Sequence, residues 1–188
     1  MVLRSVPATA WKIMATIMSW LHMLRNLALR ATAFQSSTLG GAVARKAVDG
    51  NRNSIWDGGS CSRTDRDRNP WWRVDLGKAY KVTRVIITNR GDCYAERING
   101  AQIRIGNSLE NNGNNNELAE AVVSIPLGET KTFNFKPING RYVNIVIPGR
   151  NEFLTLCEVE SWRTQASRHL SQGMQRNSGG GNRAQRAR

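Results

Sequence analysis

Strand-like alternation of apolar and polar residues recurs through the middle of this chain. Val143, Ile145 and Ile147 alternate with Tyr142 and Asn144. Successive side chains of a β-strand point to opposite faces, so the first three would share one face of a sheet and the other two the opposite face. The alternation therefore predicts a strand that ends near Ile147.

Other segments rich in β-branched residues predict further strands. With the strand at 141–147, they cover residues 72–76, 82–88, 101–105, 121–125, 130–135 and 154–162. Gly-containing breaks at Asn99, Asn112 and Asn139 separate several of these segments. No long amphipathic helix and no internal repeat is evident. We therefore predict an all-β fold, either a jelly-roll β-barrel or a β-sandwich.

The two ends of the 188-residue chain differ from its middle. Residues 1–25 place Arg4 and Lys12 before a mostly apolar stretch, an order typical of a secretory leader. An unprocessed start that packs nowhere is the alternative, because no small-residue cleavage site follows. Residues 165–188 are rich in Gln, Ser, Arg and Asn and predict a disordered basic tail. We expect one folded domain over residues 26–164 and no membrane span, since no apolar run reaches ~18 residues.

The net charge of +13 is unevenly distributed. All 14 acidic residues lie between Asp49 and Glu160, whereas 15 of the 27 Lys and Arg lie in that span and 12 in the two flanks. The expected folded body is therefore nearly neutral. Basic flanks of this kind usually remain solvated, and we predict no nucleic-acid partner.

Catalytic motifs are missing from the sequence. Both histidines, His22 and His169, lie in the flanks, so the body has no histidine for acid–base or triad chemistry. It also lacks a P-loop, zinc-ligand spacing and a dinucleotide-binding glycine motif. Asp65 and Asp67 form a carboxylate pair, but they are typical of a surface loop. We predict that the protein is not an enzyme.

Several longer runs are more specific than a strand pattern. They are NLAL at 26–29, AVDGN at 47–51, NPWWRVDL at 69–76, TNRGDCYAERING at 88–100, IGNSLENNG at 105–113 and GRYVNIV at 140–146. In order and spacing, residues 26–162 resemble the F-type lectins, or fucolectins. The resemblance implies a discoidin-like jelly roll with a fucose site at one end and a calcium ion nearby. It also implies a secreted protein that recognises fucosylated glycans in innate defence and assembles as a homo-oligomer, a trimer by family precedent.

Arg90 and Arg97 are the strongest candidates for sugar binding. A sugar presents hydroxyls and one apolar face, so its site needs fixed donors and a flat surface. Each guanidinium offers several donors in a rigid fork, whereas Asp92 between them is suited to hold one arginine in position. These three residues match the motif whose arginines bind the sugar in the family.

Two positions depart from the family pattern. Arg63 stands where the family has a third sugar contact, a histidine, and it adds a longer stem and a fixed charge. Fucose binding is then retained, weakened, or shifted toward a sulfated or sialylated glycan. Cys93 and Tyr94 replace two adjacent cysteines that pack on the sugar in the family, so Tyr94 is expected either to serve as a substitute platform or to pack on a neighbouring loop. Trp56 is a further candidate for a pocket wall, with a core position as the alternative.

The resemblance also implies a calcium site. Calcium prefers six to eight oxygen ligands from carboxylates, amides and carbonyls. The side chains expected to bind it belong to Asp49, Asn51, Ser60 and Glu158, and the carbonyls to Lys46 and Cys157.

Three cysteines leave at least one unpaired. The resemblance pairs Cys61 with Cys157, which requires an oxidising compartment. A second family bridge is missing here, with Ala119 and Phe135 at its two ends, where apolar packing is expected instead. Cys93 would then be a free thiol, either inert or available for pairing with another chain.

A discoidin-like module with an altered target is the alternative to a fucose lectin. Arg63, Arg66 and Arg68 form a basic cluster suited to anionic lipid or anionic glycan. The tripeptide Arg90-Gly91-Asp92 resembles an integrin ligand, although the sugar motif already accounts for it.

Overall fold

Two layers of antiparallel strands make up the described part of the protein, residues 25–163, in this computed structural model. The strands are β1 (Thr32–Gln35), β2 (Ser62–Arg63), β3 (Asp67–Arg68), β4 (Trp71–Thr88), β5 (Gln102–Gly106), β6 (Glu117–Ala121), β7 (Thr130–Val146), β8 (Asn151–Glu152), β9 (Thr155–Leu156) and β10 (Glu158–Arg163). Four short 3-10 helices join them: η1 (Ala44–Val48), η2 (Trp56–Gly58), η3 (Ala95–Ile98) and η4 (Glu110–Gly113). The predicted leader, except Arg25, and the predicted tail lie outside the described residues.

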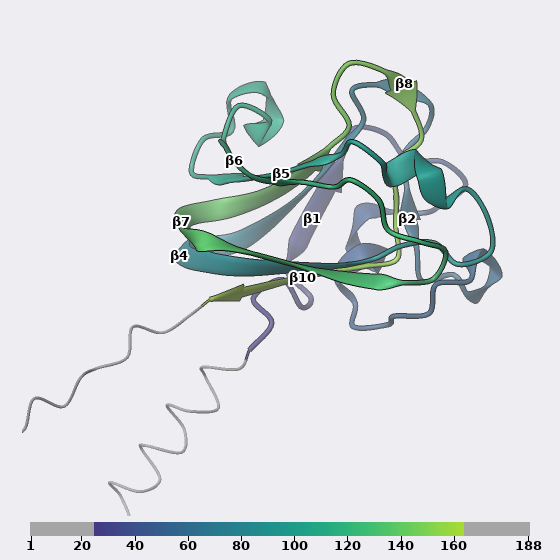
Figure 1. Ribbon diagram of the computed structural model, residues 1–188, viewed down its shortest axis with the longest axis horizontal. Helices are drawn as coiled ribbons and strands as arrows, with labels where there is room; N and C mark the ends of the chain where they lie inside the picture. Colours follow the sequence, from purple (N-terminus) through teal and green to yellow (C-terminus); the bar gives the residue numbers. More distant parts are fainter. Residues whose placement is uncertain (1–24, 164–188) are drawn as a thin grey trace, which may run out of the picture.

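The long strands β4 and β7 pass through both layers (Figure 1). They pair from Trp71 with Val146 to Thr88 with Thr130, with two irregular registers between. The first half of β4 pairs with β1 and its second half with β10. The order of the main sheet is β1-β4-β7-β5-β6, with β10 beside β4. The sheet is therefore a sandwich and not a closed barrel, which confirms the predicted all-β class and selects between its two forms.

The core lies between these layers and is almost entirely aliphatic. Its fully or nearly buried side chains include Trp72, Val74, Val85, Ile87, Ile103, Ile105, Val143, Ile145, Ile147, Leu154, Leu156 and Val159. Trp72 places its only polar atom against η1, where Nε1 donates to the carbonyl of Ala44 at 3.0 Å. Ala119 and Phe135 pack against the same core, as expected of apolar residues that replace a disulfide.

Several details of the strand prediction were wrong: residues 72–76 and 82–88 belong to one strand, β4, and the segment 154–162 is divided between β9 and β10. No break occurs at Asn139, because β7 continues through Gly140. A Cβ at Gly140 would lie 2.6 Å from Ile105 Cγ2, so the glycine permits close packing of two strands instead of a turn. The strand expected at 121–125 ends at Ala121, and the following loop still buries Val122 and Ile125.

The candidate site and the two ends of the described segment lie at opposite ends of the sandwich. Leu27 donates its backbone N–H to the carbonyl of Ser161 at 2.8 Å, so the first and last described segments lie side by side. At the other end gather η2, β2, η3 and β8 (Figure 1). No helix within residues 25–163 has the length and apolar character of a membrane span.

Candidate functional site

The loop that follows β4 is fixed from both sides. Asn89 is buried, and its Nδ2 donates to the carbonyls of Ala95 at 3.0 Å and Ile125 at 2.7 Å. Gly91 donates its N–H to the carbonyl of Ser54 at 2.8 Å, and a Cβ at Gly91 would lie 2.4 Å from Ser54 Oγ. The glycine therefore allows this loop to lie against the segment before η2. The side chains of residues 90–97 therefore project from a backbone whose position is fixed by these contacts.

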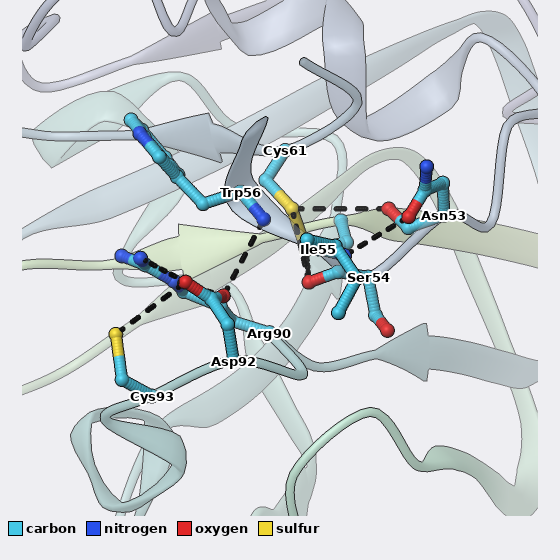
Figure 2. Close-up of polar contacts among 9 residues, drawn as sticks. Asn53, Ser54, Ile55, Trp56, Cys61, Arg90, Asp92 and Cys93 are labelled. Carbon is cyan, nitrogen blue, oxygen red and sulfur yellow. Dashed lines mark hydrogen bonds and ion pairs between the residues drawn. A yellow bond between two sulfur atoms is a disulfide. The ribbon is translucent and has the colours of Figure 1, made fainter. Parts of the chain in front are cut away.

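Arg90 and Asp92 form a two-pronged ion pair at the centre of the site (Figure 2). Arg90 Nε donates to Asp92 Oδ1 at 2.7 Å, and its NH2 group donates to Oδ2 at 2.6 Å. The N–H of Trp56 also points to Oδ1, at 3.4 Å. The Arg90 hydrogen bonds hold the pKa of Asp92 well below its usual range. This geometry matches the predicted role of Asp92, because it fixes a guanidinium that is 8% exposed.

Arg63 lies between two aromatic rings. Its guanidinium carbon is 4.8 Å from the ring centre of Trp56 and 5.2 Å from that of Phe153. Arg90 packs on Trp56 as well, also at 4.8 Å. Trp56 is half-buried and contacts two guanidinium groups, so it lies beside the arginines and outside the described core. Burial lowers the pKa of Arg63, and the nearby charges of Arg90 and Arg97 lower it further.

Arg97 completes the cluster from η3. Its guanidinium carbon lies 3.8 Å from the ring centre of Tyr94 and 4.7 Å from that of Phe153. Arg97 Nε is 3.7 Å from Glu152 Oε1, which is a loose ion pair. The carbonyl of Arg97 accepts a hydrogen bond from Arg150 at 2.7 Å. Arginines and rings therefore alternate across this end of the molecule.

Tyr94 offers an exposed ring beside this cluster. It is 53% exposed and has left-handed backbone angles, φ 58° and ψ 38°. Cys93, the free thiol, is half-buried and lies 3.6 Å from Asp92 Oδ2. Burial raises the pKa of this thiol, so the neutral form is favoured and the thiol is a poor nucleophile.

The structure brings together the six residues that were predicted to form the sugar site. They are Trp56, Arg63, Arg90, Asp92, Tyr94 and Arg97, which come from η2, β2 and the loop through η3. Sequence reasoning missed Glu152, the last residue of β8, which contacts Arg97, and Phe153, the next residue, which contacts both Arg63 and Arg97. Nothing in the local sequence links them to a loop more than 50 residues earlier, so only the fold reveals them.

Two of the residues predicted to bind calcium, Asp49 and Glu158, lie close enough for their carboxylates to interact. Glu158 is 2% exposed and accepts the N–H of Gly50 at 3.3 Å. Burial raises the pKa of Glu158 to about 8, and the carboxylates of Asp49 and Glu160 act in the same direction. Ser60 is buried and donates its hydroxyl to the carbonyl of Asn53.

These residues present mainly neutral oxygens. Lys46 lies in η1, and Asn51 follows the Asp49 turn, in which Asp49 Oδ1 accepts the N–H of Asn51 at 2.8 Å. No three His, Cys, Asp or Glu side chains within residues 25–163 lie close enough to form a metal site. An ion here would therefore depend on amide, hydroxyl and carbonyl oxygens in addition to two carboxylates, which is the donor chemistry that calcium prefers.

A disulfide joins the two segments that carry three of these six predicted ligands, Ser60, Cys157 and Glu158. Cys61 and Cys157, 96 positions apart, are bonded as predicted (Figure 2). Their sulfur atoms lie near the carbonyl of Ser54, at 3.9 Å for Cys61 and 3.7 Å for Cys157. The bond therefore ties Ser60 and Glu158, which flank the cysteines, to the segment that supports the arginine cluster.

Known proteins resemble this chain in sequence and in structure. Residues 46–145 match a family model described as a NedA-like, galactose-binding domain. The chain is 51% identical over 145 residues to Fucolectin-1 of Anguilla japonica, which covers 74% of this chain and 81% of that protein. An F-lectin (fucolectin) from the serum of the striped bass Morone saxatilis superposes with a TM-score of 0.73 at 48% identity, over 76% of this chain and 48% of that chain. A fucose-binding module of Streptococcus pneumoniae superposes with a TM-score of 0.65 at 29% identity, over 76% of this chain and all of the module (100%).

Proposed function

The chain belongs to the fucolectin family, and on that premise we propose that it is a calcium-dependent lectin for L-fucose and for glycans that end in fucose. Its relatives are carbohydrate-binding proteins, and the chain is a non-catalytic member of the same group. The proposed site is the cluster of Arg63, Arg90 and Arg97 with the rings beside them. A glycan is bound there by hydrogen bonds and apolar contact, without a chemical step.

One observation carries this proposal: Arg90 is held in a fixed orientation beside an exposed aromatic ring. Asp92 accepts two of its N–H groups, and Trp56 packs on its face. Fixed donors lose little conformational entropy when a sugar hydroxyl replaces water, because the side chain is already ordered. Tyr94 offers a flat surface for the apolar face of the sugar. Its ring also packs against Arg97, whose guanidinium carbon lies 3.8 Å from the ring centre.

Calcium is proposed to support these loops without contacting the sugar. The proposed ligands are side-chain oxygens of Asp49, Asn51, Ser60 and Glu158, together with the carbonyls of Lys46 and Cys157. A divalent cation would offset the cost of burying the Glu158 carboxylate beside Asp49. The ion and the Cys61–Cys157 disulfide would then fix the same segment from which Trp56 projects.

The proposed setting is extracellular. A disulfide persists in oxidising compartments, and the similar bass protein is described as a serum lectin. A single site for a monosaccharide gives weak affinity, so recognition of a fucosylated cell or microbial surface would require several copies of the site. We therefore propose that this chain assembles into a homo-oligomer. Its proposed role is recognition in innate defence.

Retention on immobilised L-fucose tests the site. We expect Arg90→Ala and Arg97→Ala to abolish retention, since each removes a cationic donor from the cluster. Arg66→Ala is the matched control, because Arg66 is exposed and outside the cluster. All variants should retain the wild-type far-ultraviolet circular dichroism spectrum, which reports the strands and not the rings beside the arginines. Normal retention of both cluster variants would refute the assigned site.

A further inference from the structure

Arg63 adds a third positive charge to the cluster, and this charge has no carboxylate partner. Arg90 is paired with Asp92 at 2.6 Å, and Arg97 faces Glu152 at 3.7 Å. Among residues 25–163 no ion pair involves Arg63. Its Nε is buried without a hydrogen-bond partner. The cluster therefore contains one more cation than its contacting carboxylates balance.

The rings beside Arg63 hold this charge in place without neutralising it. Trp56 and Phe153 lie at 4.8 and 5.2 Å from its guanidinium carbon. Contact with an aromatic face favours a cation, yet it supplies no oxygen to accept the N–H groups. Arg90 and Arg97 repel the charge, whereas Asp65 attracts it more weakly. An added anion would therefore receive hydrogen bonds from a guanidinium that is already oriented.

We infer that this lectin prefers fucosylated glycans that carry an anionic group, a sulfate ester or a carboxylate, and that Arg63 binds that group. The inference rests on the proposed fucose site, because Arg63 lies in the same cluster as Arg90 and Arg97. A planar guanidinium can donate to two oxygens of one sulfate or carboxylate group, whereas a neutral imidazole can donate one hydrogen bond. Where the resemblance to the family implies a histidine, Arg63 thus changes the preferred ligand and does not simply weaken the site.

Three ligands that share one fucosylated core test this inference: the neutral oligosaccharide, the same oligosaccharide with a sulfate on galactose, and the same oligosaccharide with sialic acid on galactose. Affinities are measured by titration calorimetry at low and at physiological salt. At low salt, at least one charged ligand should bind the wild-type protein on the order of tenfold more tightly than the neutral one, as expected for a new charge-assisted hydrogen bond. The preference should decrease as salt screens the charge. The comparison of the sulfated with the sialylated ligand shows which anionic group is preferred. A preference for either group over the neutral ligand supports the inference.

Two variants assign the preference to Arg63. Arg63→His should remove the difference between charged and neutral ligands and retain binding of the neutral one. Arg66→His removes the same charge from an exposed residue outside the cluster of Arg63, Arg90 and Arg97. This variant should retain the preference for the charged ligand. Arg63→Lys retains the charge without the planar fork, so it should show a reduced preference. Equal melting temperatures for these variants would show that the fold is retained.

The possible failures are distinguishable. If the wild-type protein binds all three ligands equally, the inference about the anion is wrong and the proposed fucose site stands. If it binds none of them, the proposed function itself is wrong. If a sulfated galactoside without fucose binds as tightly as the sulfated fucosylated oligosaccharide, or if Arg63→His retains the preference, general electrostatic attraction accounts for the binding and Arg63 has no specific role.

Discussion

The substitution Asp92→Asn should weaken fucose binding although Asp92 is not proposed to contact the sugar. Asp92 accepts hydrogen bonds from two N–H groups of Arg90. An asparagine has one oxygen and can accept from only one of these groups, because its NH2 group would face the other N–H group of Arg90. The Asp92 side chain is 33% exposed and that of Arg90 is 8% exposed, so the ion pair is only partly screened by solvent. An exposed pair contributes up to about 1 kcal/mol, and we take this value for the lost orientation of Arg90. Fucose affinity should therefore fall about fivefold.

Titration calorimetry with L-fucose at saturating calcium measures this loss, and thermal denaturation checks the fold. The pH dependence separates positioning from general damage. Because the pKa of Asp92 is held well below its usual range, the pair with Arg90 is fully present at neutral pH and is lost only as pH falls through that lowered value. Binding by the wild-type protein should therefore show no titration of Asp92 between pH 7 and about 4.5. Wild-type affinity in Asp92→Asn would refute the positioning role of this carboxylate.

The remaining predictions concern stability and the free thiol. Removal of calcium with EDTA should lower the melting temperature by about 5–10 °C if the ion is initially present at a hundredfold excess over its Kd. Glu158→Gln should make the melting temperature insensitive to EDTA. An unchanged melting temperature of the wild-type protein would argue against the ion. Replacement of both Cys61 and Cys157 by alanine opens a 96-residue loop and should cost up to about 4–5 kcal/mol of unfolding free energy, whereas an equally stable variant in urea denaturation would contradict that stabilising role. Gly140→Ala should cost about 1–3 kcal/mol, because its Cβ would lie 2.6 Å from Ile105 Cγ2; no loss would contradict the close strand packing. Cys93→Ser should leave fucose affinity and the elution volume in gel filtration unchanged, and a shift to a smaller species would show that Cys93 joins chains.

Strand positions were predictable where apolar and polar residues alternate and only the apolar face of the strand is buried. They were less predictable where both faces of the strand are buried. Val143 and Ile145 lie in the core as the period-2 pattern requires, but Asn144 on the opposite face is buried too. The loop around η4 covers that face, since Asn144 Nδ2 donates to the carbonyl of Asn112 at 2.7 Å. An Asn-Gly pair normally indicates a turn, yet at Gly140 the missing side chain serves close strand packing. Local sequence cannot distinguish these two uses of glycine.

The candidate site was predictable in its motif and not in its surroundings. Arg90, Asp92 and Arg97 are close in sequence, so the resemblance alone identified them. The two-ring environment of Arg63 depends on Phe153, which reaches the site only because β2 pairs with β9. The pairing of charges likewise depends on tertiary structure, because Glu152 meets Arg97 across more than 50 residues. Sequence therefore indicated three converging arginines, and only the fold shows which of them lacks a carboxylate.

Crystals grown with L-fucose and calcium test the account most directly. We expect the sugar at the loop end of the sandwich, with its hydroxyl or ring oxygens within hydrogen-bonding distance of the Arg90 and Arg97 guanidinium groups and its apolar face near Tyr94. A well-ordered protein with fucose bound elsewhere, or with no sugar at these arginines at saturating concentration, would contradict it.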